Sequence, residues 1–433
     1  MSIKPIKLPL FLLMLSGQAF TPARGQDTDT LRVMQYNLLN YGDGDNPTSY
    51  KNPRLQTILD FVKPDIFGAN EITRGAEYSE EILNTVLGAE WEKGSYANAN
   101  NQIQTNMLFW KKSKLGLLHQ QTIASQTRDI IAFRLYYKDA MLAQTRDTTF
   151  LTVIVAHLKA GSYSQDSLDR IRETALVATY LNTYPGNPGN YLFMGDMNVY
   201  TSEEGCYQNL VNSSNPKSKF YDPIDRPGNW NGNSSFADIH SQSTRRVALA
   251  DGGATGGLDD RFDQILISGP IKNNEQRISY QPMSYRIIGQ DGNHFNRGLL
   301  DNPANTIVPS TVLQSLYNMS DHLPVTARFV VRKVTQGAGI SGPQAGDPGI
   351  FNVENPLEGN LLRLHCSDVA KVDGAVKVTL HSLSGAALYS ASWEARRQSD
   401  FRVTIPGLIP GLYLLQLKGR EGNGLLHKLV LVH

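Results

Sequence analysis

Polar side chains that can bind a metal ion or move a proton stand at the ends of several apolar runs in this sequence. In the segment MGDMN, Asp196 and Asn198 are two positions apart, so in an extended chain both side chains face the same way. An ionised Asp196 could orient and deprotonate a water molecule, while the amide of Asn198 holds that water or a phosphate oxygen. Alone, an Asp-x-Asn pattern is more often an Asx turn, so these residues need support from elsewhere.

Glu71 closes the apolar run that begins at Ile66. A carboxylate at the end of so apolar a strand requires a partner or a cation. Carboxylate and amide oxygens select Mg²⁺, with Mn²⁺ or Ca²⁺ as alternatives, over zinc. Glu71 is therefore a candidate metal ligand, and an exposed carboxylate at the start of a helix is the competing interpretation.

Two histidines also stand beside apolar runs. The segment SDHLPV puts Asp321 next to His322 just before an expected strand, and a second acid, Asp263, precedes another. An Asp paired with His322 would fix its tautomer and keep it cationic, ready to hydrogen-bond the charge on a phosphoryl oxygen. His157 follows the apolar run 153–156 and fits a second phosphate-facing donor, with a capped core histidine as the alternative.

The scaffold for these side chains is a mixed α/β domain. Short β-rich runs alternate with amphipathic stretches from Leu31 onward. This alternation, with several hairpins, favours two sheets packed face to face and flanked by helices over a purely parallel sheet. The expected helices span residues 53–62, about 78–87 and 166–180, and the expected strands span 31–38, 66–72, 107–110, 129–137, 150–156, 191–194, 262–267 and 324–331.

The chain has 433 residues, which predicts one large domain and a smaller one. A Gly- and Pro-rich stretch at 333–349 lacks an apolar period and is typical of a linker. Beyond it, residues 350–433 contain short strands separated by turns, as in a small β-sandwich. The two cysteines fall on either side of this linker, so we expect no disulfide framework.

Residues 1–25 read as a secretory signal peptide. Lys4 and Lys7 precede the apolar run 8–15, and small and polar residues lead to Gly25. The apolar run is far short of the roughly 20 residues that a spanning helix needs. We therefore expect an exported protein without a transmembrane segment.

The formal net charge is +1, so the chain lacks the broad positive field with which many proteins gather nucleic acid. A bound metal ion can nevertheless attract phosphate when the overall charge is near zero. Charge therefore neither favours nor excludes a nucleic-acid substrate.

Six motifs taken together resemble the endonuclease/exonuclease/phosphatase family over about residues 30–332, and we expect the corresponding domain to span residues 26–332. Their order and approximate spacing are those of the family, which makes the set far more specific than any single motif. The resemblance implies a DNase I-like fold, which is a four-layer α/β sandwich. The motifs are QYNLLNYG around Asn37, ANEI at Glu71, VAHLKAGS at His157, MGDMN at Asp196 and Asn198, RFDQILIS at Asp263, and SDHLPV at Asp321 and His322.

The resemblance implies one catalytic Mg²⁺, with Mn²⁺ or Ca²⁺ as alternatives, held chiefly by Glu71 with Asn37 and Asp321 near it. The family often has Gln before the metal-binding Glu, where this chain has Asn70. Family members also pair the first His with a Glu, for which the candidates here are Glu77, Glu80 and Glu81.

The same resemblance implies catalytic roles. Asp196 would be the base that activates water, and Asn198 would orient that water or the phosphate. His157 and His322 would contact phosphate oxygens, with Asp263 supporting His322. Removal of the proton by the His322/Asp263 pair, in place of Asp196, stays open.

Substrate specificity on such a scaffold lies in loops, here mainly residues 200–257 and 281–313. Arg245 and Arg246 in the first loop could meet a phosphate backbone, although a solvated pair is more common. His294 in the second loop is a candidate substrate contact, with a packed loop as the alternative.

The C-terminal unit, with LHSLSGAALYS and IPGLIPGLYLLQL, resembles the sorting domain of the type IX secretion system of Bacteroidetes. The resemblance implies that this machinery is a partner and that the protein is released or held at the cell surface. An ordinary carbohydrate-binding or spacer β-sandwich is the alternative.

The sequence therefore predicts a secreted, monomeric, metal-dependent phosphodiesterase, and first a nuclease acting on DNA or RNA. A phosphatase or a phospholipid phosphodiesterase on the same scaffold is the second hypothesis. A catalytically silent binding or adhesion protein is the third, and it is disfavoured because every catalytic position is filled.

Overall fold

The computed structural model describes residues 27–142, 148–184, 189–334 and, with short gaps, 351–432. The expected signal peptide and most of the expected linker lie outside the described residues. Among the described residues, no helix combines the length and apolar character needed to cross a membrane.

The first part of the chain contains a seven-stranded sheet with one parallel pair at its centre. The strand order is β11-β13-β1-β2-β4-β3, and β12 lies beside β13. Strands β1 and β2 are parallel, and every other pair in this sheet is antiparallel. The strands are β1 (Thr28–Tyr41), β2 (Ile66–Thr73), β3 (Trp91–Lys93), β4 (Gln104–Lys111), β11 (Ile278–Tyr280), β12 (Arg286–Ile287) and β13 (Val325–Arg332).

A six-stranded sheet repeats this arrangement. Its order is β5-β6-β7-β8-β10-β9, with β7 and β8 parallel and the remaining pairs antiparallel. Each sheet therefore has one central parallel pair. The strands are β5 (Leu115–Ile123), β6 (Ile130–Tyr137), β7 (Phe150–His157), β8 (Tyr191–Asp196), β9 (Phe220–Tyr221) and β10 (Asp263–Ser268).

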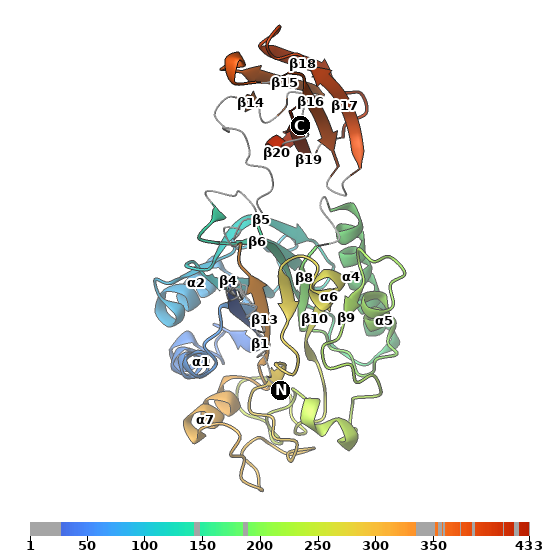
Figure 1. Ribbon diagram of the computed structural model, residues 1–433. Helices are drawn as coiled ribbons and strands as arrows, with labels where there is room; N and C mark the ends of the chain where they lie inside the picture. Colours follow the sequence, from blue (N-terminus) through green and yellow to red (C-terminus); the bar gives the residue numbers. More distant parts are fainter. Residues whose placement is uncertain are drawn as a thin grey trace, which may run out of the picture.

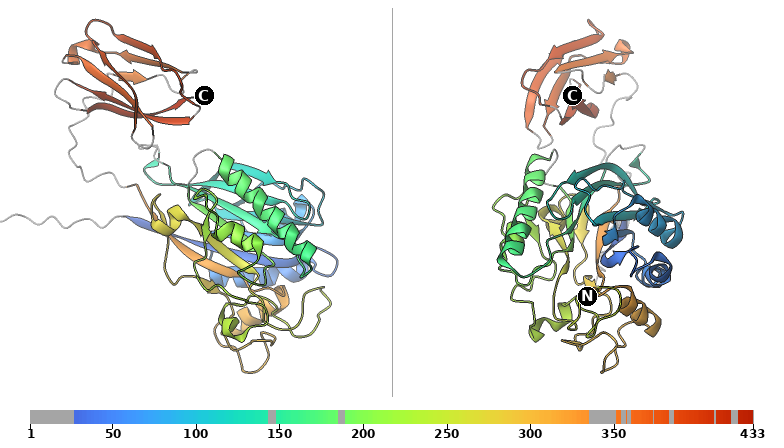
Figure 2. Two further views of the ribbon diagram at one scale, coloured as in Figure 1. Left: turned by 90° about the vertical axis from the view of Figure 1, so that its right-hand side faces the viewer. Right: turned by 180° about the vertical axis from the view of Figure 1, so that it is seen from behind.

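The two sheets pack face to face between two layers of helices, as Figures 1 and 2 show. Helices α1, α2 and α7 cover the seven-stranded sheet, and α4 and α5 cover the six-stranded sheet. This arrangement confirms the expected four-layer α/β sandwich. The helices are α1 (Thr48–Val62), α2 (Ala76–Glu81) with a π-helical turn at Ile82–Leu87, α4 (Ser164–Thr183), α5 (Gly205–Val211), α6 (Gly269–Asn273) and α7 (Ser310–Met319).

The alternation of side chains along the strands explains the layers. Val33 of β1 faces the other sheet and packs in the same apolar cluster as Val155 of β7. Its neighbour Met34 points the opposite way and packs against helix residues such as Ile58. Because both faces of the central strands are covered, these strands are apolar almost throughout.

Several elements differ from the sequence-based expectation, which did not include helices α5, α6 and α7 or strands β3, β9, β11 and β12. Helix α1 begins at Thr48, five residues before the expected start, and Pro53 lies inside it. Its first turn is held by tertiary contacts, because the ammonium of Lys51 donates to the carbonyl of Leu38. Strand β5 was not expected from the sequence; it is an edge strand whose middle residues, such as His119, are exposed.

The described residues from 351 onward form two small antiparallel sheets that share one apolar core, consistent with the expected β-sandwich. Leu362 and Leu364 of one sheet pack with Val376 and Val378 of the other in this core. The first sheet contains β14 (Phe351–Val353), β15 (Leu361–Cys366) and β18 (Asp400–Thr404), and the second contains β16 (Val376–His381), β17 (Ala387–Trp393), β19 (Gly411–Lys418) and β20 (Gly424–Val432).

Candidate active site

The candidate catalytic side chains meet at one edge of the sandwich, where strands of both sheets end. Asn37 and Glu71 lie near the carboxyl ends of the parallel strands β1 and β2, and His157 and Asp196 end β7 and β8. Asp263 begins β10, which is antiparallel to β8, so it lies at the same edge and pairs with Asp196. His157 pairs with Asp196 in turn, and His322 lies just before β13.

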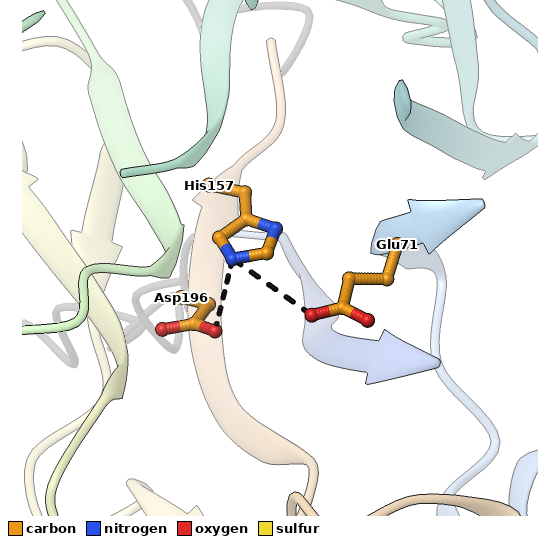
Figure 3. Close-up of side chains that lie close together, drawn as sticks. All are labelled: Glu71, His157 and Asp196. Carbon is orange, nitrogen blue, oxygen red and sulfur yellow. Dashed lines mark ion pairs between the residues drawn. The ribbon is translucent and has the colours of Figure 1, made fainter. Parts of the chain in front are cut away.

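Glu71, His157 and Asp196 form the centre of the site (Figure 3). Their ligand atoms lie within 4.8 Å of one another. The Nε2 atom of His157 is 3.4 Å from Oδ2 of Asp196 and 3.9 Å from Oε1 of Glu71. Asn37 donates its amide to both carboxylates, at 2.9 Å to Glu71 and 3.0 Å to Asp196. Two acids from opposite sheets are thus held on one amide.

The charges at this centre match a divalent cation. Burial raises the pKa of Asp196 to about 7. Burial, and then the negative charge of Asp321, also raise the pKa of Glu71. Both shifts come chiefly from burial, which disfavours the ionised carboxylates, and a divalent cation would stabilise their charge. The two carboxylates are the oxygen donors that Mg²⁺ and Mn²⁺ prefer, and the imidazole of His157 lies beside them.

This donor set differs in part from the one expected. Asn37 directs its amide nitrogen to the carboxylates, and its Oδ1 accepts from the backbone N–H of Leu39 at 3.0 Å. The carboxylate of Asp321 accepts from the side chain of Gln242 at 3.1 Å and from the backbone N–H of Ala254 at 2.8 Å. Of the three expected ligands, Glu71 belongs to the central cluster, and Asn37 contacts two of its carboxylates through its amide nitrogen.

His157 is a neutral imidazole in this setting. Burial, followed by the positive charges of Arg128 and His322, lowers its pKa well below the usual value. The acids beside it are Asp196 and Glu71, whereas Glu80 pairs with Lys93 at 2.8 Å. Of the other two acids proposed as its partner, Glu77 is exposed and Glu81 accepts a hydrogen bond from Asn52. A neutral His157 can donate a hydrogen bond or ligate a metal, but it brings no positive charge to a phosphate.

His322 supplies the positive charge instead. Burial by itself lowers its pKa, but the charges of Asp263, Asp321 and Asp196 raise it well above the usual value. Its Nδ1 lies 2.7 Å from Oδ2 of Asp263, and the hydroxyl of Ser241 donates to the same oxygen at 2.8 Å. The opposite nitrogen, Nε2, faces the centre, 3.6 Å from Oδ2 of Asp196.

Two site residues have backbone conformations that side chains rarely adopt. Glu71 has a φ of 55° and Asn198 a φ of 50°. Such strain persists only where surrounding contacts impose it. The backbone N–H of Asn198 donates to Asp196 at 3.0 Å, and its side-chain amide donates to the carbonyl of Leu158 at 3.2 Å.

Asn70, which stands where the family often has Gln, joins the two sheets behind the site. Its Oδ1 accepts from the backbone N–H of Asp196 at 3.0 Å. Its Nδ2 donates to the side chain of Asn106 at 2.7 Å and to the carbonyl of Ala156 at 3.1 Å. Asn70, whose side chain is shorter than that of Gln, therefore holds the end of β2 against β7 and β8.

Two residues near the site carry no clear signal in the sequence. Gln242 contacts both His322 and Asp321, yet it lies in a stretch without an apolar run. Arg128 donates to the carbonyl of Leu158 at 3.1 Å, and its charge lowers the pKa of Glu71 and His157. Arg128 comes just before an apolar strand, so a search of strand starts as well as strand ends would have found it.

The structure corrects two of the three expected substrate contacts. Arg245 is fully buried, with Nη1 2.6 Å from Asp251 and Nε donating to the carbonyl of Tyr317 at 3.0 Å. His294 is also fully buried. Its ring nitrogens lie 2.8 Å from the carboxylate of Asp291 and 3.0 Å from the carbonyl of Asp301. Both hold loops together. Arg246 is open to solvent, with 64% of its side chain exposed.

No protein-family profile matches the chain, and no curated protein matches it in sequence. Solved structures with a similar fold include TDP2 from D. rerio complexed with single-strand DNA product, at a TM-score of 0.45 and 13% identity, covering 69% of this chain and 98% of that chain. An endonuclease/exonuclease/phosphatase family protein from Bacteroides thetaiotaomicron has a TM-score of 0.44 and 14% identity, covering 70% and 99%. A mannosyl-6-phosphatase from the same species has a TM-score of 0.43 and 14% identity, covering 69% and 99%. At these values the likeness assigns no activity to this chain.

Proposed function

We propose that this protein is a divalent-metal-dependent phosphoesterase. The observation that carries the proposal is the convergence of Glu71, His157 and Asp196 from both sheets on one point, beside the Asp263–His322 pair. An acidic centre next to a charged imidazole suits a reaction in which a metal and a cation share the charge of a phosphoryl group. A site with only a structural role would not need so many buried titratable groups.

Glu71, Asp196 and His157 would hold the cation. When bound, it would stabilise negative charge on a phosphoryl oxygen and make a water molecule more acidic. Asp196 lies between the two imidazoles, 3.4 Å from His157 and 3.6 Å from His322, and is the group placed to orient the water and accept its proton. Asn37 keeps the two carboxylates in position through its shared amide.

His322 would contact the phosphoryl group on the side away from the cation. Asp263 holds Nδ1, so the ring is fixed with Nε2 towards the centre. A cationic His322 donates a hydrogen bond from Nε2 to a phosphoryl oxygen and stabilises the charge that develops there. Asn198, two residues after Asp196, contributes a side-chain amide on the same rim, fixed by its hydrogen bond to the carbonyl of Leu158.

Within this class we favour a nuclease acting on DNA or RNA. Nutrient scavenging suits an exported enzyme of this resemblance, and Arg246, which is exposed and lies 3.5 Å from Asp301, could also meet a phosphate backbone. A phosphatase or phospholipid phosphodiesterase is the alternative, because the loops that would select the substrate carry no decisive motif.

The test is hydrolysis of plasmid DNA, total RNA, bis-p-nitrophenyl phosphate, a phosphate monoester and a phospholipid by the full chain, with Mg²⁺ or EDTA. Asp196→Ala and His322→Ala should abolish activity, while the exposed-residue controls Asp60→Ala and His119→Ala should retain it. Cleavage of nucleic acid supports the nuclease. Cleavage of only the monoester or only the lipid would identify a phosphatase or a phospholipid phosphodiesterase. No cleavage with any divalent ion would contradict the proposal.

We also propose that the protein is exported and sorted by its C-terminal domain. Residues 1–25 and the β-sandwich from 351 onward support this through their sequence patterns and the described fold. In a Bacteroidetes host with a type IX system, the full chain should reach the medium or the cell surface. A chain that ends at residue 332 should stay in the periplasm, and equal export of both forms would contradict the proposal.

A further inference from the structure

The segment from Ser241 to Thr244 is held against the site by backbone hydrogen bonds on both sides. On one side, the N–H of Ser241 donates to the carbonyl of Asp260 at 2.7 Å, and the N–H of Asp260 donates to the carbonyl of Gln242 at 2.9 Å. On the other side, the N–H of Leu323 donates to Ser241 at 2.7 Å, and that of Thr244 donates to Asp321 at 2.9 Å. This short stretch is therefore fixed in place although it belongs to no sheet.

Two side chains of this segment contact catalytic residues. Ser241 donates to Asp263, as described above. The Nε2 atom of Gln242 lies 2.6 Å from Nε2 of His322 and 3.1 Å from Oδ2 of Asp321. Gln242 thus contacts the imidazole nitrogen that faces Asp196 and the centre, not the nitrogen that Asp263 holds.

Gln242 is also the member of the segment that solvent can reach. Its side chain is half-buried, whereas Ser241, Ser243 and Thr244 are buried. A phosphoryl oxygen that approaches Nε2 of His322 must therefore enter the space beside the Gln242 amide.

We propose that Gln242 is a further catalytic residue, whose side-chain N–H donates a hydrogen bond to the same phosphoryl oxygen as Nε2 of His322. The proposal rests on the phosphoesterase function proposed above. In the free protein the amide nitrogen of Gln242 lies beside Nε2 of His322, so both N–H donors are free to turn to one phosphoryl oxygen when substrate binds. Because the backbone around Gln242 is fixed, the donor is already in place when substrate arrives, as charge-stabilising groups in active sites require.

Matched variants separate a donor from a structural amide. Gln242→Met keeps the length of the side chain and removes the N–H, and Gln242→Glu keeps the shape and replaces the donor with an acceptor. Gln290→Met is the control, because Gln290 is also half-buried and donates to the carbonyl of His240 at 2.7 Å, outside the catalytic set. All variants are made in the full chain, and their folding is checked by thermal denaturation.

Three readouts are measured: the imidazole ¹⁵N shift of His322 without metal, the affinity for inorganic phosphate with Mg²⁺, and the kinetics on bis-p-nitrophenyl phosphate. We expect both Gln242 variants to move the His322 resonance, to weaken phosphate binding at least tenfold, and to lower kcat by about 10²-fold with little change in KM. Gln290→Met should resemble wild type in all three.

The outcomes distinguish this inference from the proposed function. If wild type hydrolyses the diester and the Gln242 variants match it in kcat and phosphate affinity, the inference is wrong and the function stands. If wild type binds phosphate through Gln242 but hydrolyses no ester, the contact stands and the function fails. If wild type neither binds phosphate nor hydrolyses any ester, both are wrong.

Discussion

Asn37 of one sheet donates its side-chain amide to Asp196 of the other, at 3.0 Å, and the same nitrogen reaches Glu71 at 2.9 Å. One neutral side chain thus sets the separation between two carboxylates that would otherwise repel each other. The catalytic geometry depends on how the two sheets are packed, because the two acids belong to different sheets.

Asn37→Ala should therefore disturb the site more than the fold. Without the shared amide, Glu71 and Asp196 lose their common partner, and we expect activity or metal affinity to fall by about 10- to 100-fold. Asn190→Ala is the control, because Asn190 is a buried amide that bonds the carbonyls of Phe150 and Gln276 away from the site. The measurement is steady-state kinetics on the folded fraction of each variant. An equal loss of activity in Asn37→Ala and Asn190→Ala would contradict the role of Asn37.

Metal binding should stabilise the protein through Glu71. A ligand that binds only the folded state raises the free energy of unfolding by about 2.7 kcal/mol at 100 times its Kd, so Mn²⁺ or Mg²⁺ should raise Tm by several degrees and EDTA should reverse the shift. Glu71→Gln should lose this response, while Glu90→Gln, which changes an exposed acid, should keep it. A full metal response in Glu71→Gln would exclude Glu71 as a ligand.

Gly195→Ala should be severely destabilising. Gly195 has a φ of +151°, and a Cβ there would lie 1.7 Å from the carbonyl oxygen of Ala156 on the neighbouring strand. Since backbone atoms must move apart, we expect a loss of at least ~3 kcal/mol in urea denaturation. Gly232→Ala is the comparison, because Gly232 also has a positive φ but open space around it, and its cost should be nearer ~1 kcal/mol. Similar losses at both positions would refute the steric explanation.

Lys51 should make stability depend on pH above neutrality. Burial lowers its pKa from 10.5 to about 7, so between these values the unfolded chain binds a proton that the folded chain has released. Stability contributed by Lys51 therefore rises with pH from about 7 to 10.5, by at most about 1.4 kcal/mol per pH unit. The difference in unfolding free energy between wild type and Lys51→Met should grow from pH 7 to pH 9.5.

Lys112→Met, which removes an exposed lysine, serves as the control for that titration and should show no such growth. A constant difference between wild type and Lys51→Met across the same range would show that the buried ammonium does not release its proton.

The sequence predicts the strand-end residues because they follow a simple physical signal. Glu71, His157 and Asp196 each come at the end of an apolar run, and buried strands place their last side chains at a sheet edge. The pairing of the two sheets could not be read from the runs, because any one run fits several partners. The left-handed backbone of Glu71 likewise depends on tertiary contacts.

Residues outside the strands were less predictable. Arg245 was expected to be available to substrate, since arginine is usually exposed, yet Asp251 pairs with it in the interior. Gln242 lies in a stretch without a periodic pattern of apolar residues, and it reaches His322 only through the folding of the chain. Such loop residues reach the site through contacts between segments that are distant in sequence, which local patterns do not encode.

Metal-dependent catalysis at Asp196 can be measured as the rate of bis-p-nitrophenyl phosphate hydrolysis by the full chain, stripped of metal with EDTA and then restored with Mg²⁺ or Mn²⁺, beside Asp196→Asn. We expect no hydrolysis in the stripped protein, activity after the cation returns, and none in Asp196→Asn under either condition. Hydrolysis that persists in EDTA, or an active Asp196→Asn protein, would contradict metal-dependent catalysis at Asp196.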